Sequence, residues 1–488
     1  MSVAVAQTMN TCPPLRDYQA AGVTWLTTSL RDHKAVLLCD DPGLGKTRQA
    51  LTTASHLAAR RVLIVCPAGA RRVWRDEIER WFPLWNARVF LVEPGTLTGP
   101  VQRMLAYPGP LILVIGYDDL SPTESNVPGL LASHANPWDL LIIDEAHYLK
   151  NFSNRTKAVY GVRGDNEGIQ ANAAHVILLS GTPTPNHAGE LWQHCRTLWP
   201  WSLLWPHGSP RAGQRMSQQD FEERFTRYRD TVYGRQIAGS KHQDQLRATL
   251  ARVVLRRRKD DVLPELPPLQ IQDIALGAPL KNQQLNPQAQ ALADRLVWSL
   301  GALTQPGGDN QLLKTLQTPD GELATLRREL GELKVPPAIL WVQERLQSTN
   351  KILLFAWHLS VIEHLRRGLA DFDPVVITGE TSPLGRTNAV ELFQRRVGVR
   401  VFIGQIKAAG TAITLTAASE VAIVEPSWVP GENVQAICRA HRLGQRDSVL
   451  ASFLYLPGTL DQRIMAAFRR KAHEIAELQG DQINASAG

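Results

Sequence analysis

The chain has 488 residues, of which 44% are hydrophobic and 20% are charged, and its formal net charge is +7. This is the composition of a globular protein of about two to four domains, and no apolar run approaches the roughly 20 residues of a membrane-spanning helix. The five widely spaced cysteines contain no CxxC pair, and the N-terminus lacks a secretion signal, so we expect a soluble, cytoplasmic protein without a zinc site or disulfide framework. The mildly basic charge is compatible with a polyanionic partner.

The first predicted element is an amphipathic helix over residues 15–26, LRDYQAAGVTWL, in which apolar positions recur at roughly helical spacing. Its Gln19 has two interpretations. The amide can contact the edge of an adenine, or the residue can be an ordinary solvated helix residue. This stretch alone favours the solvated residue.

A buried strand over residues 35–39 runs into the sequence DDPGLGKT and then into a helix that ends near residue 60. The general phosphate-loop pattern is GxxxxGK[ST], and its first glycine would fall at Asp40, so the full pattern is not met. The GxGKT core is present, however, between a strand and a helix. This context predicts a loop that binds the phosphates of ATP.

The residues of this core have separate chemical uses. Gly43 and Gly45 allow backbone N–H groups to wrap a phosphate. Lys46 adds a positive charge for the β- and γ-phosphates, and Thr47 offers a hydroxyl to Mg²⁺. We therefore expect ATP and Mg²⁺ as cofactors.

Four further apolar runs have the length of buried strands and alternate with helical stretches. They cover residues 62–67, 111–115, 140–143 and 176–179. The alternation predicts a doubly wound parallel sheet with its site at the carboxyl ends of the strands. Arg71, Arg72 and Arg75 follow the first of these runs, where they can grip a nucleic-acid backbone or form a charged, exposed helix face.

Two adjacent acids follow the run that ends at residue 143, within IIDEAHYLKN. Asp144 can hold a metal ion, and Glu145 can orient an attacking water. His147 lies two residues further on, where it can sense the nucleotide. The letters DEAH alone equally fit a solvated acidic turn. After the next strand, Ser180 and Thr182 can link the nucleotide site to a moving partner lobe.

In the middle of the chain, residues 190–270 break the alternation, and residues 280–335 are rich in Gln, Leu and Gly. The clustered tryptophans favour a packed hydrophobic plug over base stacking, and they are Trp192, Trp199, Trp201 and Trp205. A basic run lies within RVVLRRRKDDVLPELPP, where it forms a solvated or salt-bridged helix end, or else a phosphate or interlobe contact. The run comprises Arg256, Arg257, Arg258 and Lys259. A domain boundary is expected at the two prolines at 336 and 337.

Strands resume in the second half, at residues 351–356, 375–377, 401–403 and 421–424. A helix is predicted over residues 431–442, and Gln435, Arg439 and Arg442 then share one face of it. One amide and two guanidiniums suit a γ-phosphate and the charge that develops during its transfer, although a surface salt-bridge face is the alternative. This half contains no second phosphate loop, so we expect it to lend residues to the first site.

These blocks, taken in order, resemble the Swi/Snf-type DNA translocase ATPases of helicase superfamily 2. Between residues 15 and 445 they read LRDYQAAG, DDPGLGKT, VLIVCPAGARRVW, LILVIGYDDL, IIDEAHYLKN, LLSGTPTPN, VLRRRKDDVLPELPP, KILLFAWHLSVIEHL, ITGET and WVPGENVQAICRAHRLGQ. RRRKDDVLPELPP and RAHRLGQ are specific to this family rather than to helicases in general. WVPG and ITLTAAS look most like the annealing-helicase (HARP-type) and bacterial or phage branch.

The resemblance implies an α/β fold of two RecA-like doubly wound parallel-sheet lobes in tandem, with helical insertions between them. We expect lobe 1 over residues 12–200, insertions and linker over 201–335, and lobe 2 over 336–488. The implied activity is DNA-stimulated ATP hydrolysis by a monomeric motor that tracks on double-stranded or branched DNA in a bacterial or phage-infected cell. A DEAH-type RNA helicase and a DNA-binding scaffold without turnover are the alternatives.

The resemblance also assigns roles to residues. In the ATP site, Gln19 contacts adenine, Gly43, Gly45, Lys46 and Thr47 bind phosphate and magnesium, Asp144 holds magnesium, Glu145 polarises water, Gln435 lies near the γ-phosphate, and Arg439 and Arg442 are arginine fingers. The coupling residues are His147, Ser180, Thr182 and Gly410. The DNA-backbone contacts are Arg72, Tyr117, Thr378 and Lys407. The stretch KAAGTAITL departs from the family, because it has Ala409, Ala412 and Thr414 where many members carry glycines and an asparagine.

Overall fold

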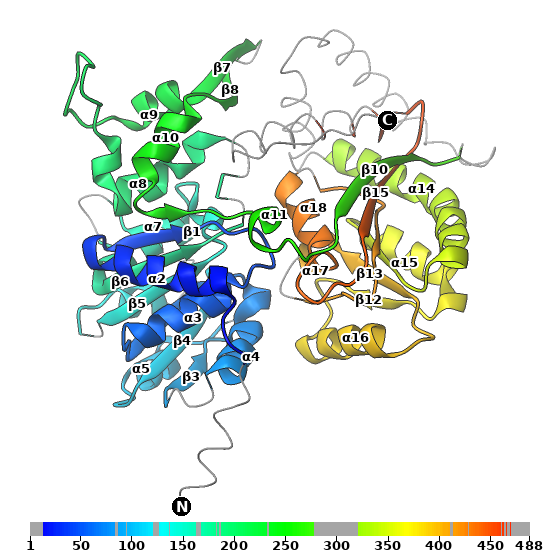
Figure 1. Cartoon of the computed structure of the whole chain (residues 1–488), viewed down its shortest axis with the longest axis horizontal. Helices are drawn as coiled ribbons and strands as arrows, with labels where there is room; N and C mark the ends of the chain where they lie inside the picture. Colours follow the sequence, from blue (N-terminus) through cyan, green and yellow to red (C-terminus); the bar gives the residue numbers. More distant parts are fainter. Residues whose placement is uncertain are drawn as a thin grey trace, which may run out of the picture. The chain divides into compact units, whose positions relative to one another are not determined.

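The structure is a computed structural model, and the chain forms two compact units (Figure 1). The structure describes residues 13–82, 86–93, 95–120, 126–135, 137–162, 167–181, 183–184, 187–231, 234–277, 321–409, 413–427 and 429–459, with 461, 462, 465 and 469. The first unit comprises Met1–Thr184, Ala188–Phe225 and Lys241–Val262, and the second comprises Pro185–His187, Thr226–Ser240 and Leu263–Gly488.

The first unit is built on a seven-stranded, all-parallel sheet with the order β3-β4-β2-β5-β6-β1-β9. Its strands are β1 (Ala35–Leu38), β2 (Arg61–Cys66), β3 (Arg88–Leu91), β4 (Leu111–Gly116), β5 (Trp138–Asp144), β6 (Ala173–Leu179) and β9 (Val254–Leu255). The central strands are almost continuously apolar and buried because helices cover both faces of a parallel sheet.

Helices lie before, between and after these strands along the chain. They are α2 (Asp17–Asp32), α3 (Lys46–His56), α4 (Arg71–Trp81), α5 (Thr98–Leu105), α6 (Val127–Leu131), α7 (Asn154–Tyr160), α8 (Trp192–Leu198), α9 (Gln218–Phe225), α10 (Gln243–Leu250) and α11 (Lys259–Val262). Three of them, α8, α9 and α10, lie between β6 and β9. On one face of the sheet, α2, α3 and α4 bury Leu26, Leu51 and Trp74 in a common core with alternate strand residues. The short 3₁₀ turns are Ala68–Ala70, Tyr117–Leu120, Ala146–Leu149, Ile169–Asn172, Ala188–Leu191 and Pro200–Leu203.

The second unit repeats this design with six parallel strands in the order β10-β15-β14-β11-β13-β12. These are β10 (Leu269–Ala275), β11 (Ile352–Ala356), β12 (Val375–Ile377), β13 (Val401–Gln405), β14 (Glu420–Ile423) and β15 (Val449–Tyr455). One face packs on α14 (Gly321–Ser348) and α15 (Leu359–Gly368), the other on α16 (Pro383–Arg395) and α18 (Pro430–Ile437). The remaining elements are α17 (Ile406–Ala409), the turn Ala370–Phe372 and an antiparallel hairpin, β7 (Thr226–Thr231) with β8 (Gly234–Ser240).

The predicted fold class is confirmed, since both sheets are parallel and doubly wound. The two prolines do not end a secondary-structure element, because Pro336 and Pro337 lie inside α14, and the domain boundary expected there stays a prediction. A proline costs a helix mainly the N–H bond to the preceding turn, and here packing offsets that loss. The flanking Lys334 is 2% exposed and pairs with Asp461 at 3.0 Å, while Ala338 is fully buried.

The segment 201–335, expected to hold insertions and a linker, also contributes strands to both sheets. Its β9 extends the first sheet, and its β10 extends the second. The lobe boundaries themselves stay a prediction. The hydrophobic plug is confirmed for Trp192 and Trp199, which are 8% and 1% exposed, whereas Trp201 is 38% exposed. The Trp199 indole N–H donates to the carbonyl oxygen of Ala35 at 2.8 Å, which ties the plug to β1.

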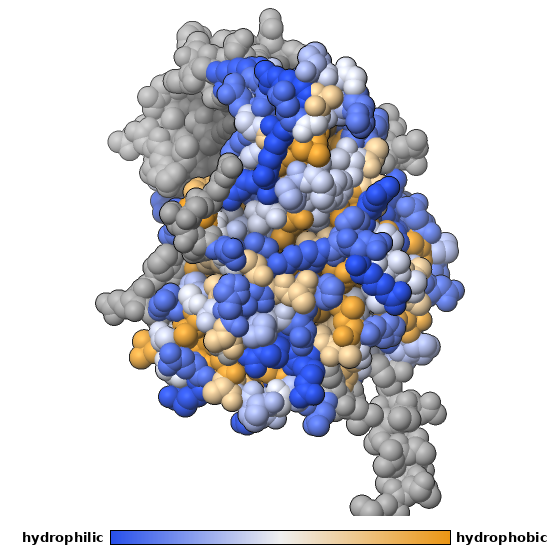
Figure 2. Space-filling view, turned by 90° about the vertical axis from the view of Figure 1, so that its left-hand side faces the viewer, coloured by the Kyte–Doolittle hydropathy of each residue, from blue (hydrophilic) through white to orange (hydrophobic). Residues whose placement is uncertain are grey.

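The surface of the first unit interleaves hydrophilic and hydrophobic residues, and hydrophilic residues prevail on the face seen in Figure 2. Among the described residues, no helix combines the length and the apolar character that crossing a membrane requires.

A buried histidine in this unit predicts acid sensitivity. His194 is 1% exposed, and its Nδ1 lies 2.6 Å from the Tyr160 hydroxyl. Burial, with a smaller effect of His147, lowers the pKa of His194 to about 4. Because the unfolded chain protonates first, near pH 6.5, this histidine stabilises the fold above that pH and loses the contribution as the pH falls towards 4. Between pH 7 and pH 5 the loss is about 2 kcal/mol.

We therefore expect acidification from pH 7 to pH 5 to lower the thermal-unfolding midpoint of the wild type by about 5 °C more than that of His194→Gln. Glutamine retains an acceptor for Tyr160 but does not titrate. Equal losses in the two proteins would show that His194 does not cause the acid sensitivity.

Candidate functional site

Three loops meet at the carboxyl edge of the first sheet. In the strand register, Leu38 of β1 lies opposite Leu179 of β6, and Leu179 lies opposite Asp144 of β5. The chain therefore leaves these neighbouring strands at the same level. A Cβ placed on Gly181, just after β6, would lie 3.5 Å from Nζ of Lys46. The loop after β1, the acidic pair after β5 and the loop after β6 thus form one site.

The loop after β1 has the backbone of a phosphate-binding loop. Gly43 and Gly45 have φ values of 95° and 75°, which residues with a Cβ rarely adopt. Gly45 directly precedes α3, so the first N–H groups of that helix face the loop. Nζ of Lys46 donates to the carbonyl oxygen of Asp40 at 2.7 Å. A neutral carbonyl is a weaker partner for an ammonium than a phosphate oxygen, so this loop fits a phosphate chain.

Asp144 ends β5 with its carboxylate held by two donors. Oδ2 accepts from the indole N–H of Trp74 at 2.9 Å, and Oδ1 accepts from the backbone N–H of Glu145 at 3.0 Å. Shielding from water, followed by the charge of Glu145, raises the pKa of Asp144 to about 6. A carboxylate in this environment gains from a nearby cation.

Glu145 has a left-handed backbone, with φ 49° and ψ 53°. This conformation is uncommon for a residue with a side chain, and such strain often marks a functional turn. Its Oε2 lies 3.3 Å from Nδ1 of His147, which lies 3.2 Å from the hydroxyl of Ser180. The structure therefore brings together three predicted site residues, one catalytic and two coupling.

Two aromatic residues support Asp144, and neither supporting role was predicted from the sequence. Trp74, whose indole binds the carboxylate, lies in the block VLIVCPAGARRVW but carried no signal of its own. Tyr117 was predicted to touch the DNA backbone. Its side chain is 1% exposed, its hydroxyl donates to the carbonyl oxygen of Asp144 at 2.7 Å, and its ring stacks on Tyr148 at 5.1 Å. This burial weighs against a direct phosphate contact, and the DNA role stays a prediction.

Gln19 is 4% exposed, so the interpretation as a solvated helix residue is wrong. Its Nε2 donates to the carbonyl oxygen of Leu44 at 3.3 Å, and its Oε1 accepts from the backbone N–H of Arg16 at 3.2 Å. A Cβ on Gly45 would lie 2.5 Å from Nε2 of Gln19. Gln19 therefore packs directly against the glycine loop. Its contact with adenine stays a prediction.

The arginines after β2 divide into different environments. Arg71 is buried, pairs with Asp119 and donates to the carbonyl oxygen of Val92 at 3.0 Å, which is neither of the two expected roles. Arg72 is about half exposed and lies 3.5 Å from Oε1 of Glu93. Arg72 thus remains available to a surface ligand, and its DNA contact stays a prediction.

The basic run after β9 is salt-bridged to the phosphate loop. Arg257 pairs with Asp40 at 2.5 Å, and Arg256 lies 3.6 Å from Asp41. The backbone N–H of Lys259 donates to Oδ2 of Asp41 at 3.0 Å. The salt-bridged interpretation is therefore confirmed for these arginines. Asp40, the acid that replaces the expected glycine, was the signal that could have predicted the contact.

The second unit corrects one local prediction. Helix α18 ends at Ile437 rather than at residue 442, so Gln435 lies on it while Arg439 and Arg442 lie beyond it. The chain tightens after the helix, and the carbonyl oxygen of Arg439 accepts from the N–H of Leu415 instead of continuing a helical ladder, at 2.9 Å. Nη1 of Arg442 donates to the carbonyl oxygen of Ile413 at 3.0 Å. The three residues therefore do not share one helix face.

The remaining predicted residues are described in part. The hydroxyl of Thr378 lies 3.4 Å from that of Thr381 at the end of β12. The backbone of Lys407 lies in α17. Thr182 and Gly410 lie outside the described residues. The roles of all four stay predictions.

The site residues fit a magnesium nucleotide. Within the part of the chain that the structure describes, no group of three or more His, Cys, Asp and Glu side chains could hold a metal by itself. Mg²⁺ is commonly held by one or two carboxylates together with substrate phosphates. Asp144 and the hydroxyl of Thr47 would be the protein ligands of such an ion, and Lys46 would meet the phosphates.

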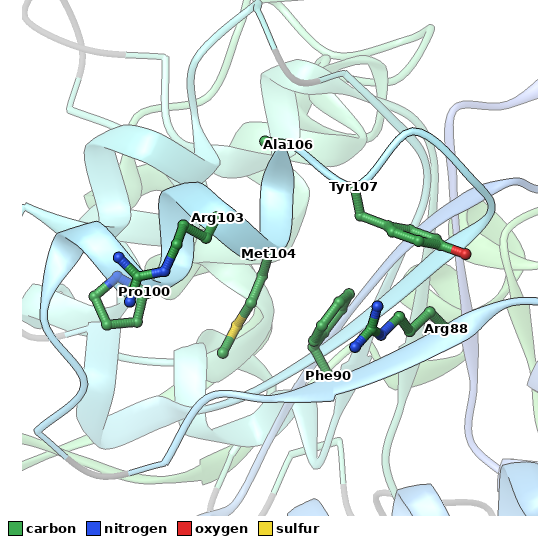
Figure 3. A pocket seen from close by; sticks show the side chains of 7 residues that line it. All are labelled: Arg88, Phe90, Pro100, Arg103, Met104, Ala106 and Tyr107. Atoms are coloured by element: carbon green, nitrogen blue, oxygen red, sulfur yellow. The ribbon is translucent and has the colours of Figure 1, made fainter.

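A pocket elsewhere in the first unit does not belong to this site. It is lined by Arg88 and Phe90 of β3, by Arg103 and Met104 of α5, and by Tyr107 (Figure 3). Arg88 lies opposite Leu111, the first residue of β4, so this pocket is at the amino edge of the sheet. This pocket is therefore separate from the candidate site, which lies at the carboxyl edge.

Comparisons with known proteins match nearly the whole chain. The model of the SNF2-related domain matches residues 18–286, and that of the helicase conserved C-terminal domain matches residues 335–444. A Caenorhabditis elegans relative, the SWI/SNF-related matrix-associated actin-dependent regulator of chromatin subfamily A-like protein 1 homolog, is 27% identical over 94% of this chain and 61% of its own length. The human DNA annealing helicase and endonuclease ZRANB3 is 28% identical over 94% of this chain and 40% of its own.

This chain therefore spans about 40–61% of the length of those relatives. Among solved structures, the Sulfolobus solfataricus SWI2/SNF2 ATPase core in complex with dsDNA aligns over 97% of this chain and 94% of its own, with a TM-score of 0.44 and 22% identity. The SNF2-related model covers more than half of the 488 residues. By this match, the chain belongs to the SNF2-related family.

Proposed function

We propose that this protein is an ATP-dependent DNA translocase, a helicase-like motor that hydrolyses ATP while it tracks on double-stranded or branched DNA. The observation that carries the proposal is the meeting of Lys46, Asp144, Glu145 and Ser180 at one edge of the first sheet. The family match and the human relative, which is named a DNA annealing helicase, favour DNA as the polymer. In a bacterial or phage-infected cell such a motor would work in the cytoplasm, as a monomer.

The residues of the first unit divide the work. Lys46 and the N–H groups that follow Gly45 hold the phosphates, and Gln19 reads the adenine. Bound Mg²⁺ would offset the charge of the β- and γ-phosphates. Asp144 and Thr47 would hold that ion. Glu145 accepts a hydrogen bond from the attacking water and polarises it.

Other residues complete the cycle. We propose that Arg439 and Arg442, assisted by Gln435, stabilise the charge that develops on the γ-phosphate during its transfer. The coupling residues are His147, Ser180, Thr182 and Gly410, of which the first two already contact each other. The proposed phosphate contacts along DNA are Arg72, Thr378 and Lys407, whereas the buried Tyr117 bonds to Asp144 instead. Phosphate contacts of this kind position a protein without reading sequence.

ATP turnover measured in parallel with no nucleic acid, duplex DNA, single-stranded DNA and RNA tests the polymer. We expect duplex or branched DNA to stimulate turnover at least severalfold, and RNA to do so less. DNA affinity should fall steeply with added salt and depend little on sequence, because the contacts are to phosphates. Stimulation by RNA alone would contradict the proposal and favour a DEAH-type RNA helicase. Wild-type protein that binds DNA but turns over no ATP would favour a scaffold.

A further inference from the structure

A buried ion pair holds the phosphate loop from outside the loop. Arg257 donates to both carboxylate oxygens of Asp40, from Nε to Oδ1 at 3.0 Å and from Nη2 to Oδ2 at 2.5 Å. The Asp40 side chain is fully buried, and that of Arg257 is 15% exposed. Two parallel bonds of this kind fix the orientation of both partners. Asp40 is the first residue of the sequence DDPGLGKT, so Arg257 fixes the start of the phosphate loop.

The same guanidinium also holds helix α2 and helix α3. Nη1 donates to the backbone carbonyl oxygen of Tyr18, on α2, and the group lies 5.5 Å from the centroid of the Tyr18 ring. Nη2 donates to Oε1 of Gln49, on α3, at 2.6 Å, and Nε2 of Gln49 donates to Asp40 at 3.0 Å. One side chain thus connects the loop, the helix that follows it and the helix that carries Gln19.

Gly22 leaves the space in which this network forms. A Cβ on Gly22 would lie 2.0 Å from Oε1 of Gln49 and 2.5 Å from Nη2 of Arg257. Both side chains are held by several hydrogen bonds, so neither can move aside without breaking them. The absence of a side chain at Gly22, the glycine of the block LRDYQAAG, therefore leaves room for Arg257 and is not a requirement of the helix.

The network ends on Gln19. Tyr18 and Gln19 are neighbours on α2, and the Tyr18 hydroxyl and the Gln19 amide both donate to the carbonyl oxygen of Leu44 in the phosphate loop, at 3.2 and 3.3 Å. A shift of Arg257 would move Tyr18 relative to Asp40, and it would move Gln19 relative to the glycines. The position of the adenine-reading amide thus depends on a residue more than two hundred positions later in the chain.

We propose that Arg257 is a positioning residue that sets both the affinity for the nucleotide and the preference for adenine. It does so by holding Gln19 and the phosphate loop in one fixed relation. This inference rests on the proposed function, in which the site binds ATP through Gln19 and Lys46. It assigns to Asp40, which replaces the glycine of the general loop pattern, the task of anchoring the loop to Arg257.

Equilibrium dissociation constants for ATP and GTP, measured on the full chain, test this role. Arg257→Lys keeps the charge but loses the planar fork. Gly22→Ala leaves every charge in place and favours the helix, yet it displaces the guanidinium. We expect each variant to weaken ATP binding roughly tenfold or more, as is typical when the group that orients a binding residue is lost. GTP binding should weaken less, so the dissociation constant for GTP divided by that for ATP should decrease.

Arg258→Lys is the matched control, since Arg258 belongs to the same basic run but pairs with the exposed Asp260 at 3.3 Å. We expect its two constants to stay within about twofold of wild type, the scatter of a surface substitution. Thermal unfolding of each variant separates a loss of fold from a loss of positioning, and the two independent substitutions guard against one that does not fold.

Folded Arg257→Lys and Gly22→Ala proteins with wild-type constants for both nucleotides would overturn the inference. So would equal weakening of ATP and GTP, because a purely structural role lowers stability or overall affinity without changing the ratio. Wild-type protein that binds no ATP is a different result, since it would overturn the proposed function itself.

Discussion

Glu145→Gln is expected to bind ATP about as well as the wild type and to hydrolyse it at least about 100-fold more slowly. Glutamine keeps the size and the hydrogen-bonding capacity of the residue but cannot accept a proton from the attacking water, and general-base catalysis is typically worth about 10²–10⁴-fold. The left-handed backbone at Glu145 and the 3.3 Å approach of His147 hold this carboxylate at the strand end, next to Asp144. The measurement is single-turnover hydrolysis on saturating duplex DNA, with ATP affinity determined separately.

Two further variants serve as comparisons for Glu145→Gln. Lys46→Ala should lose both affinity and turnover, because Lys46 meets the phosphates in the ground state as well as in the transition state. Glu79→Gln removes an exposed acid of α4 and should leave both unchanged. A Glu145→Gln protein that hydrolyses ATP at the wild-type rate would remove Glu145 from the role of general base.

The sequence was sufficient to predict most strands of both sheets because these strands carry a strong local signal, but it did not predict β3, β9, β10 and β15. Buried runs such as LILVIG and ILLFA are too short and too apolar for surface helices, and they recur between helical stretches. The position of the site followed from the same pattern, since parallel strands place their carboxyl ends on one edge. The sequence alone therefore predicts that Asp144, Glu145 and Lys46 lie at one site.

Contacts between distant segments could not be predicted in this way. The basic run at residues 256–259 fits a solvated helix end equally well, and only the fold places Arg257 against Asp40. The same holds for Gln19, whose burial depends on packing against Gly45 rather than on its own helix. The residue spacing also overestimated the length of α18. Residues at i, i+4 and i+7 share a face only while the backbone carbonyl oxygens continue to bond within the helix. At Arg439 the carbonyl oxygen bonds to Leu415 instead.

Arg439 and Arg442 keep their proposed role although α18 ends before both of them. A shared helix face no longer aligns the two guanidiniums. Backbone and side-chain bonds to the segment around Ile413 and Leu415 hold them instead, in the turns after α18. That segment is the end of the stretch KAAGTAITL, which departs from the family. The shape of the arginine turn therefore depends on a part of the chain where the family pattern is not kept.

Replacing both arginines, Arg439→Ala with Arg442→Ala, is expected to abolish DNA-stimulated hydrolysis while fold and DNA binding are retained. An arginine that stabilises the transferring phosphoryl group is worth about 10³-fold or more, whereas a surface salt bridge contributes about 0–1 kcal/mol. The two interpretations thus differ by orders of magnitude in one assay. Lysine should restore little activity at either position because it lacks the planar fork.

Arg446→Ala is the matched control, an exposed arginine of the same segment, and it should keep wild-type turnover. Both predicted arginines lie in the second unit, whereas Lys46 and Glu145 lie in the first. A loss of turnover with unchanged DNA affinity would therefore show that the second unit takes part in hydrolysis and does more than bind the polymer. A double variant that still hydrolyses ATP within a few-fold of wild type on saturating duplex DNA would show that neither arginine takes part in hydrolysis. The first unit would then have to stabilise the transition state with Lys46 and its own backbone N–H groups.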